Sequence, residues 1–436
     1  MMINASSGLI SGSPTTEGSL NVNISVSDGN GGTDTASITV TVTGANNAPT
    51  AVGTLADIAN DDAAIVTIAT SAAFSDTDAS DTLTYSATGL PAGLTINTAT
   101  GEISGTIDNS ASQGGTGGVY SIVVTATDTS GATATQGFDW TISNPAPVAT
   151  DDAGTATENV QLTVNTANGV LSNDSDVDGD ALTVSEVNGS AGDVTNAVAG
   201  TNGGLFTLAA DGSYVFTDNN QFESLAVGET ATTSIDYTVS DGEGGTDTAT
   251  LTVTVTGTND APTVQTLLTD QTGNDSDVVS VATSAGFADV DTSDILTYSA
   301  ANLPGGLTID PSTGIISGTI DSSASQGGNS GTAGTYNVVI TATDPSGATA
   351  TQSINWVVAN PDPVANPDTN STSENDAQLV VNAANGVLNN DSDADGDTLT
   401  VSAVNGVAGN VTATVTGTNG GNFIINADGS YVFNDN

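Results

Sequence analysis

Hydrophobic and polar residues alternate along short runs of this chain. Residues 38–43, 120–127 and 251–256 carry apolar side chains at every second position, with mostly threonine between them. Half-buried antiparallel strands require this period of two. Residues 205–208 and 214–216 flank the turn Asp211-Gly212, which predicts a β-hairpin. Since no segment shows a helical period, we predict an all-β fold of tandem immunoglobulin-like antiparallel sandwiches in an extended array.

The chain repeats itself over long distances. The segment Ser27-Asp-Gly-Asn-Gly-Gly-Thr-Asp recurs as Ser240-Asp-Gly-Glu-Gly-Gly-Thr-Asp, and Pro49 recurs as Pro262, an offset of 213 residues. Leu83-Thr-Tyr-Ser recurs as Leu296-Thr-Tyr-Ser. The repeating unit is therefore a pair of domains, here called type A and type B.

Proline-containing junctions follow strand-like runs and indicate the domain boundaries. They predict a partial B domain over 1–47, an A domain over 48–145, a B domain over 146–260, an A domain over 261–361 and a partial B domain over 362–436. The first part supplies the last strands of a B domain and the last part supplies the first strands. We therefore expect the chain to be a fragment of a longer periodic array.

The charge of the chain limits its partners. It contains 50 acidic residues and no Lys, Arg or His, so its formal charge is −50 and no internal salt bridge can offset it. This field repels nucleic acid and anionic lipid and attracts cations. Such a charge is also typical of a disordered acidic tail, but 36% of the residues are hydrophobic and they alternate in strand-like runs. No run approaches the roughly 18 apolar residues of a membrane span, so direct membrane insertion is not expected.

The composition leaves little for catalysis. Without His, Cys or Lys the chain has no Ser-His pair, no thiolate and no Schiff-base lysine. Paired acids such as Asp151 and Asp152 could suggest glycoside hydrolysis, but nothing predicts the cleft that this reaction needs. Trp140 and Trp356 lie at equivalent strand positions, where a place in the core or at a domain interface is favoured over a carbohydrate platform. We predict that the chain is not an enzyme.

Alternating aspartates in loops are the strongest chemical signal. Type A carries Asp76, Asp78 and Asp81, repeated as Asp289, Asp291 and Asp294. Type B carries the denser run Asp174-Ser-Asp-Val-Asp-Gly-Asp180, repeated from Asp391 to Asp397. Clustered carboxylates repel one another unless a hard cation binds between them, and Ca²⁺ accepts six to eight oxygens in flexible geometry. The alternative is a solvated acidic turn. An EF-hand is disfavoured, because Ser185 occupies the twelfth loop position and the flanking residues predict strands.

Several motifs in order resemble bacterial cadherin-like repeats over nearly the whole chain. Type A is similar to the dystroglycan-type cadherin-like domain in its Asp-x-Asp loop, Leu83-Thr-Tyr-Ser and Val124-Thr-Ala-Thr-Asp128. Type B is similar to the VCBS or cadherin-like repeat in Ala210-Asp-Gly-Ser-Tyr-Val-Phe216, Tyr237-Thr-Val-Ser-Asp241 and Gly257-Thr-Asn-Asp-Ala-Pro262. The resemblance implies an extracellular protein, on the bacterial surface or secreted, as in large RTX-type adhesins that support cell adhesion or biofilm formation.

The resemblance also implies Ca²⁺ at the domain junctions, bound by acids of both domains and the linker. The expected ligands are Asn47, Asp76, Asp78 and Asp128 at the first junction; Asp62, Asn144, Asp176, Asp178, Asp180 and Asp241 at the second; Glu158, Asn259, Asp260, Asp289, Asp291 and Asp344 at the third; and Asp275, Asn360, Asp393, Asp395 and Asp397 at the fourth. The first junction should be the weakest, since Asn47 stands where the third has Asp260. No counterpart of the Asp-Arg-Glu motif of animal cadherins is found, which argues against full occupancy by three ions.

Two roles follow from this resemblance. The chain is either a passive stalk that calcium holds in an extended form, or a direct adhesion module that binds glycans, other surface proteins or other copies of the array. Near-identical repetition favours the stalk, because recognition sites usually lie on a few distinctive loops.

Overall fold

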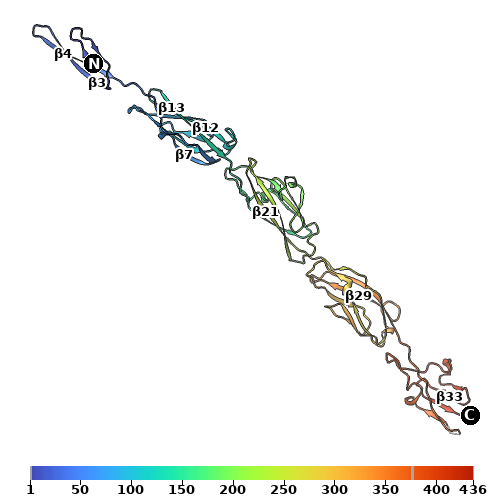
Figure 1. The fold of residues 1–436 in the computed structure, drawn as a ribbon. Coiled ribbons are helices and arrows are strands. Elements are labelled where there is room, and N and C mark those ends of the chain that lie inside the picture. Colours follow the sequence, from blue (N-terminus) through green and yellow to red (C-terminus); the bar gives the residue numbers. More distant parts are fainter. Residues whose placement is uncertain (1, 375–377, 436) are drawn as a thin grey trace.

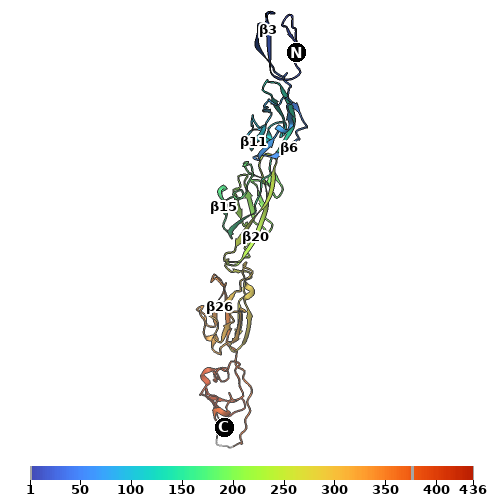
Figure 2. The ribbon, with the colours of Figure 1, turned by 90° about the vertical axis from the view of Figure 1, so that its left-hand side faces the viewer.

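The computed structural model describes residues 2–374 and 378–435. These residues form β-sheets, and their helices are single 3-10 turns. Two views at right angles show the sheets arranged along one extended line, with the chain termini at opposite ends (Figures 1 and 2). The predicted all-β array of sandwiches is confirmed.

Residues 48–145 form two sheets around one core. The larger sheet has the order β6-β13-β12-β9 and the smaller has the order β10-β11-β7, while β5 pairs with β8. Trp140 is fully buried between the sheets with Ile103 and Val124, so its predicted place in the core is confirmed. The strands are β5 (Thr50–Ala51), β6 (Ile58–Asp61), β7 (Ile65–Ala69), β8 (Phe74–Ser75), β9 (Thr84–Thr88), β10 (Leu94–Ile96), β11 (Glu102–Thr106), β12 (Val119–Thr127) and β13 (Thr133–Ser143).

Residues 261–361 repeat this topology. Their sheets have the orders β23-β30-β29-β26 and β24-β28-β27, β22 pairs with β25, and Trp356 is buried in the core. The strands are β22 (Thr263–Val264), β23 (Gln271–Asn274), β24 (Val278–Ala282), β25 (Phe287–Ala288), β26 (Thr297–Ala301), β27 (Leu307–Ile309), β28 (Ile315–Thr319), β29 (Thr335–Thr343) and β30 (Thr349–Ala359).

Residues 146–260 form a sandwich of two four-stranded sheets. The sheets have the orders β14-β21-β20-β16 and β15-β19-β18-β17. Along β21 the apolar residues Leu251, Val253 and Val255 are fully buried, while the threonines between them face outward, as the alternating pattern predicts. The strands are β14 (Asp152–Thr157), β15 (Leu162–Val164), β16 (Thr183–Val187), β17 (Ala197–Ala199), β18 (Leu205–Leu208), β19 (Tyr214–Thr217), β20 (Thr230–Ser240) and β21 (Thr246–Thr256).

The two end segments are smaller. Residues 2–47 contain β1 paired with β2 and the long hairpin β3–β4, and residues 362–435 contain one sheet of order β31-β34-β33-β32. These strands are β1 (Met2–Ile3), β2 (Ile10–Ser11), β3 (Gly18–Ser27), β4 (Thr33–Val42), β31 (Leu379–Val381), β32 (Thr414–Thr416), β33 (Asn422–Ile425) and β34 (Tyr431–Asn434).

The pairing of the first and last strands of each sandwich determines where the junctions lie. In each of the three sandwiches the first strand of one sheet pairs in parallel with the last strand: β6 with β13, β14 with β21, and β23 with β30. The chain therefore enters a sandwich at one end and leaves it at the other.

The short 3-10 helices are η1 (Ser71–Ala73), η2 (Ala111–Gln113), η3 (Thr166–Asn168), η4 (Ala191–Asp193), η5 (Ser284–Gly286), η6 (Ala324–Gln326), η7 (Ala383–Asn385) and η8 (Ala408–Asn410). Among the described residues no helix is long and apolar enough to cross a bilayer.

Candidate metal centres at the domain junctions

Buried carboxylates concentrate at the junctions. Nine acidic side chains are buried in the described residues, and all of them except Asp218 belong to the ligand set predicted from sequence. They are Asp62, Asp128, Glu158, Asp178, Asp218, Asp241, Asp275, Asp291 and Asp344. Charged groups are buried only when something compensates their charge, and this chain has no cationic side chain to do so.

The third junction, around Asp260, holds two groups of acids. Glu158 follows β14, Glu223 lies in the loop after β19, and Asp260 lies in the linker after β21, yet one carboxylate oxygen of each lies within 4.8 Å of the other two. A second group at the same spacing is formed by Asp289, Asp294 and Asp344 from the following sandwich. The sandwich of residues 146–260, the linker and the sandwich of residues 261–361 therefore all contribute acids to this junction.

Hydrogen bonds fix the linker of the third junction to both neighbours. The backbone N–H of Thr258 donates to Oε2 of Glu158 at 2.8 Å. Asn259 donates from Nδ2 to Oδ2 of Asp344 at 2.9 Å, and the backbone N–H of Asp260 donates to Oδ2 of Asp291 at 3.0 Å. These bonds leave the second oxygen of Glu158 and of Asp291 without a partner, whereas the second oxygen of Asp344 accepts from the backbone N–H of Ala348 at 2.8 Å.

Six oxygens of this junction are buried without a hydrogen-bond partner in the described residues. They are Oε1 of Glu158, Oε1 of Glu223, Oδ1 of Asn259, Oδ2 of Asp260, Oδ2 of Asp289 and Oδ1 of Asp291. Burial and then the neighbouring negative charges raise the pKa of Glu158, Glu223, Asp260 and Asp289. Unpaired buried oxygens with like-charge repulsion are the arrangement that a hard cation relieves, so these residues fit Ca²⁺.

The second junction, around Asn144, is similarly built. Asn144 donates from Nδ2 to Oδ2 of Asp241 at 2.8 Å, as Asn259 does to Asp344. Both carboxylate oxygens of Asp178 are buried without a partner. Burial, the close approach of the Asp176 carboxylate and the charges of Asp176 and Asp180 raise the pKa of Asp178 to about 7.

Two further predicted residues belong to the second junction. Burial, followed by the charges of Asp176 and Asp241 and then more weakly that of Asp62, raises the pKa of Asp180. Oδ1 of Asp62 accepts a hydrogen bond from the backbone N–H of Ser112 at 2.9 Å. In the described part of the chain, no three acids of this junction lie within 4.8 Å of one another. They are therefore more widely spaced than the acids of the third junction.

The first junction brings Asp76, Asp81 and Asp128 within 4.8 Å of one another. Asn47 donates from its backbone N–H and its Nδ2 to the two oxygens of Asp78 at 2.7 and 2.9 Å. These bonds lower the pKa of Asp78. Asn46 donates to Asp128 at 2.8 Å. Asn47 therefore contributes hydrogen-bond donors here, where Asp260 contributes a carboxylate at the third junction.

The fourth junction is the least complete. Oδ1 of Asp275 accepts from the backbone N–H of Ser325 at 2.8 Å, repeating the contact of Asp62. Asp393, Asp395 and Asp397 are linked by successive backbone donations, from Asp395 to Asp393 at 3.1 Å and from Asp397 to Asp395 at 3.3 Å. The hydrogen bonds of Asn360 go to Pro361 and Ser325, so none of them reaches this loop.

Three acids of these groups are absent from the ligand set predicted from sequence. Asp81 and Asp294 lie in the predicted acidic loops, and Glu223 lies outside every predicted motif. Glu223 reaches the third junction from the sandwich of residues 146–260, although the sequence has no Asp-Arg-Glu motif there. The sequence shows it only as an acid in the long loop between the strand-like runs 214–217 and 230–240.

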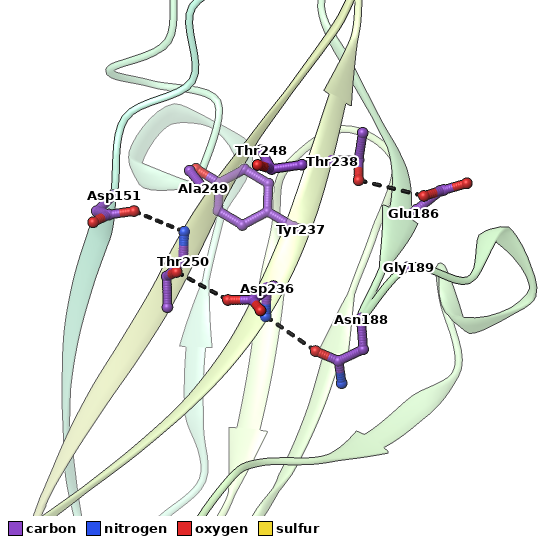
Figure 3. A pocket seen from close by; sticks show the side chains of 10 residues that line it. All are labelled: Asp151, Glu186, Asn188, Gly189, Asp236, Tyr237, Thr238, Thr248, Ala249 and Thr250. Atoms are coloured by element: carbon purple, nitrogen blue, oxygen red, sulfur yellow. Dashed lines mark hydrogen bonds between the residues drawn. The ribbon is translucent and has the colours of Figure 1, made fainter.

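A shallow hollow of about 580 Å³ lies on the outer face of the sheet β14-β21-β20-β16 (Figure 3). Asp151 accepts there from the backbone N–H of Thr250 at 2.8 Å, and Asp236 accepts from the hydroxyl of Thr250 at 2.9 Å. Asp152 instead accepts from the buried hydroxyl of Tyr237 at 2.8 Å. Asp151 and Asp152 therefore point to opposite sides of the strand and cannot flank one glycosidic bond.

Sequence comparison assigns the chain to known domain families. The "Putative Ig domain" profile matches residues 1–43, 48–143 and 261–359, more than half of the chain, and the chain belongs to this family. The bacterial cadherin-like domain matches residues 144–257, and a bacterial Ig domain matches residues 360–436. The protein is a bacterial cadherin-like repeat protein, as its motifs indicated. Domains of these kinds are typical of extracellular structural and adhesion proteins, and cadherin-like domains generally bind Ca²⁺.

The solved structures that match the chain include cadherin ectodomains. Mouse cadherin-23 EC22-24 is 15% identical, with a TM-score of 0.36, and the match covers 72% of this chain and 99% of that one. The human desmocollin-1 ectodomain is 13% identical, with a TM-score of 0.28, and the match covers 92% of this chain and 76% of that one. No curated protein matches the sequence.

Proposed function

We propose that this chain is a calcium-rigidified stalk segment of a large bacterial surface adhesin of the RTX type, acting outside the cell in adhesion or biofilm formation. Calcium ions at the junctions hold successive sandwiches in line, so that the array projects a binding module away from the surface. The predicted domain boundaries, at about 47, 145, 260 and 361, are part of this proposal. The chain has a mechanical role and no catalytic one.

The observation that carries the proposal is the third junction. Glu158 and Glu223 belong to one sandwich, Asp289 and Asp344 to the next, and Asp260 to the linker between them. A cation bound by such a set is a bond between the two domains. Since Ca²⁺ binds only the assembled junction, it stabilises the aligned arrangement by mass action.

Without a cation the same junction works against alignment. Two carboxylate charges 4.8 Å apart repel by about 3.5 kcal/mol at an effective dielectric of about 20, before solvent screening reduces the value. The linker is then expected to bend so that these charges separate. Calcium should therefore change the shape and the stability of the chain together.

Small-angle X-ray scattering with calcium, and then with excess chelator, tests this function. The expected result is a longer and stiffer particle with calcium, together with a higher melting temperature by calorimetry. Magnesium at equal concentration is the control, because its strict octahedral geometry suits these crowded carboxylates poorly. Identical scattering profiles and melting temperatures in calcium and chelator would show that the array is rigid or flexible regardless of metal, and the proposal would be wrong.

A further inference from the structure

The sandwich of residues 261–361 has one sheet edge with no protection against pairing. In the described residues β24 pairs only with β28, so its other side is an edge of the sheet β24-β28-β27. This β24 edge has the sequence Val278-Val-Ser-Val-Ala282, without a charge, a proline or a glycine. Natural sheet edges are usually protected by charged side chains, by proline or by a covering segment. An edge that lacks them is a template for another strand.

The hydrogen bonds that flank β24 show which backbone groups point out from this edge. Asp277 and Thr283 lie on either side of β24, and their backbones are hydrogen-bonded to the residues next to β28, at 3.0 and 3.1 Å. Antiparallel strands exchange hydrogen bonds at every second residue, so the backbone groups of Val278, Ser280 and Ala282 face away from β28. In the part of the chain that the structure describes, no hydrogen bond reaches these outward groups.

The other edges of the same sandwich are less open. In β26 the backbone N–H of Tyr298 donates to Pro311 at 2.9 Å, so a loop covers part of that edge. Strand β23 contains Gly273, which weakens strand pairing, and β27 has only three residues. At the β24 edge, in contrast, the side chain of Val278 is 85% exposed. This edge therefore offers both open backbone groups and an apolar side chain.

Strand β7 forms the same edge in the sandwich of residues 48–145. It has the sequence Ile65-Val-Thr-Ile-Ala69, and Ile65 is 84% exposed. One acid distinguishes the two sheets, because Glu102 pairs with Ala69 whereas its counterpart Ile315 pairs with Ala282. The strands β24, β28 and β27 contain no acid at all. Of the two edges, β24 is therefore the one that a negatively charged molecule can approach more closely.

The charge of the chain decides which partner fits this edge. A basic partner is attracted to the acids of the junctions and not to a neutral strand, whereas two copies of charge −50 can meet only where both are uncharged. The β24 edge is also self-complementary. A twofold axis at Ser280 sets Val278 opposite Ala282 of the other copy, and the nearest acid, Asp277, opposite Thr283. Charge and sequence therefore both favour a second copy of this chain.

We propose that β24 of one copy pairs antiparallel with β24 of a second copy, so that two three-stranded sheets become one six-stranded sheet. The outward groups of Val278, Ser280 and Ala282 then form up to about six backbone hydrogen bonds with the other copy. Because the sandwich of residues 261–361 lies within the extended line of domains, the contact joins two chains side by side (Figure 1). It goes beyond the proposed stalk function and uses none of the junction acids.

Sedimentation equilibrium of the 436-residue chain tests the pairing, in about 0.15 M salt to screen the charge of the copies. Two paired five-residue strands bury less than the roughly 1,200 Å² of stable complexes, so we expect a monomer–dimer equilibrium with a dissociation constant of about 0.1–1 mM. Ser280→Asp sets two charges opposite each other and should weaken the dimer at least 10-fold. Ser353→Asp adds the same charge on the other sheet of the sandwich and should change it less than twofold. Equal melting temperatures of the two variants show that both still fold.

Cysteine cross-linking tests the register, since the chain has no cysteine of its own. Directly opposed residues of a hydrogen-bonded pair lie about 5.5 Å apart between Cα atoms, within the range of a disulfide. Ser280→Cys should therefore give a disulfide-linked dimer on oxidation, and Ser353→Cys should not. A mixture of Val278→Cys and Ala282→Cys chains should cross-link, whereas Val278→Cys alone should not.

Three results would overturn the proposal. They are a chain that stays monomeric up to about 1 mM, a dimer that Ser280→Asp leaves intact, and a dimer that chelator abolishes at equal ionic strength. The last result would show that calcium bridges junction acids of two copies instead. A chain whose scattering does not respond to calcium would refute the stalk function and leave the β24 pairing standing.

Discussion

Replacing Asp260 by asparagine should change the stability of the chain in opposite directions without and with calcium. The carboxylate of Asp260 lies within 4.8 Å of ligand oxygens of Glu158 and Glu223, and the charges of Asp291 and Asp289 further raise its pKa. Asparagine keeps the size of the side chain and its carbonyl oxygen but removes the charge. The first junction already carries this residue type, since Asn47 is the counterpart of Asp260.

The magnitude follows from the spacing. Each charge pair at 4.8 Å contributes up to about 3.5 kcal/mol of repulsion at an effective dielectric of about 20, and partial exposure reduces this value severalfold. We therefore expect Asp260→Asn to raise the calcium-free unfolding free energy by about 1–3 kcal/mol. With calcium, the loss of one charged ligand should weaken binding about 10- to 100-fold.

Calorimetric melting in metal-free buffer and in calcium measures the two stabilities, and isothermal titration calorimetry measures the affinity. Asp236→Asn is the matched control, because Asp236 is an exposed acid in the middle of β20, and its counterpart in the first hairpin is Asn23. It should change neither quantity. If Asp260→Asn destabilises the calcium-free chain, or leaves calcium affinity intact, the reasoning from charge repulsion is refuted.

Three other substitutions test separate parts of the structure. The raised pKa of Asp178, about 7, means that the metal-free fold holds this proton more tightly than the unfolded chain, so stability should fall as pH rises from about 4 through 7. Asp178→Asn should flatten melting temperatures measured in metal-free buffers across this range, and an unchanged slope would contradict the assignment. Tyr237→Phe removes the buried hydroxyl that donates to Asp152 and should cost the 146–260 sandwich about 1–3 kcal/mol in urea unfolding, with calcium affinity unchanged. Gly273→Asn should stabilise the 261–361 sandwich by about 1 kcal/mol, because Nε1 of Trp356 is buried without a hydrogen-bond partner. In the first A domain the equivalent Trp140 donates to Asn60, which is the counterpart of Gly273. A loss of stability would show that the Cδ1 atom of Ile320, 3.1 Å from the added Cβ, cannot move aside.

Much of the fold could be predicted from sequence because many strands carry a local signal. The alternation in residues 251–256 determines which side chains of β21 enter the core, and Asp211-Gly212 sits in the turn between β18 and β19. The 213-residue repeat then transfers each assignment to a second copy. The parallel pairing of β14 with β21 joins strands about 100 residues apart, so no local pattern in the sequence predicts it.

The candidate sites could be predicted where their residues form a local pattern. Asp-x-Asp loops such as Asp289 to Asp291 are visible in the sequence, and their recurrence in each repeat indicated a place at the junctions. Glu223 is a single acid in a long loop, and only the folded chain brings it to Glu158, 65 positions earlier. The role of Asn47 also could not be predicted from sequence. The sequence shows that Asn47 lacks the charge of its counterpart Asp260, but only the structure shows the two hydrogen bonds that it donates to Asp78 instead.

The parallel pairing of first and last strands decides how this chain bears load. When the two ends of the array are pulled apart, β14 and β21 are drawn in opposite directions along their length, so their hydrogen bonds are loaded in shear and must break together. Bonds loaded one at a time, as in the unzipping of a hairpin, yield at lower force. The β14–β21 pair spans six residue positions, against four in β6–β13 and in β23–β30. Under tension the sandwich of residues 146–260 should therefore be the last of the three to open.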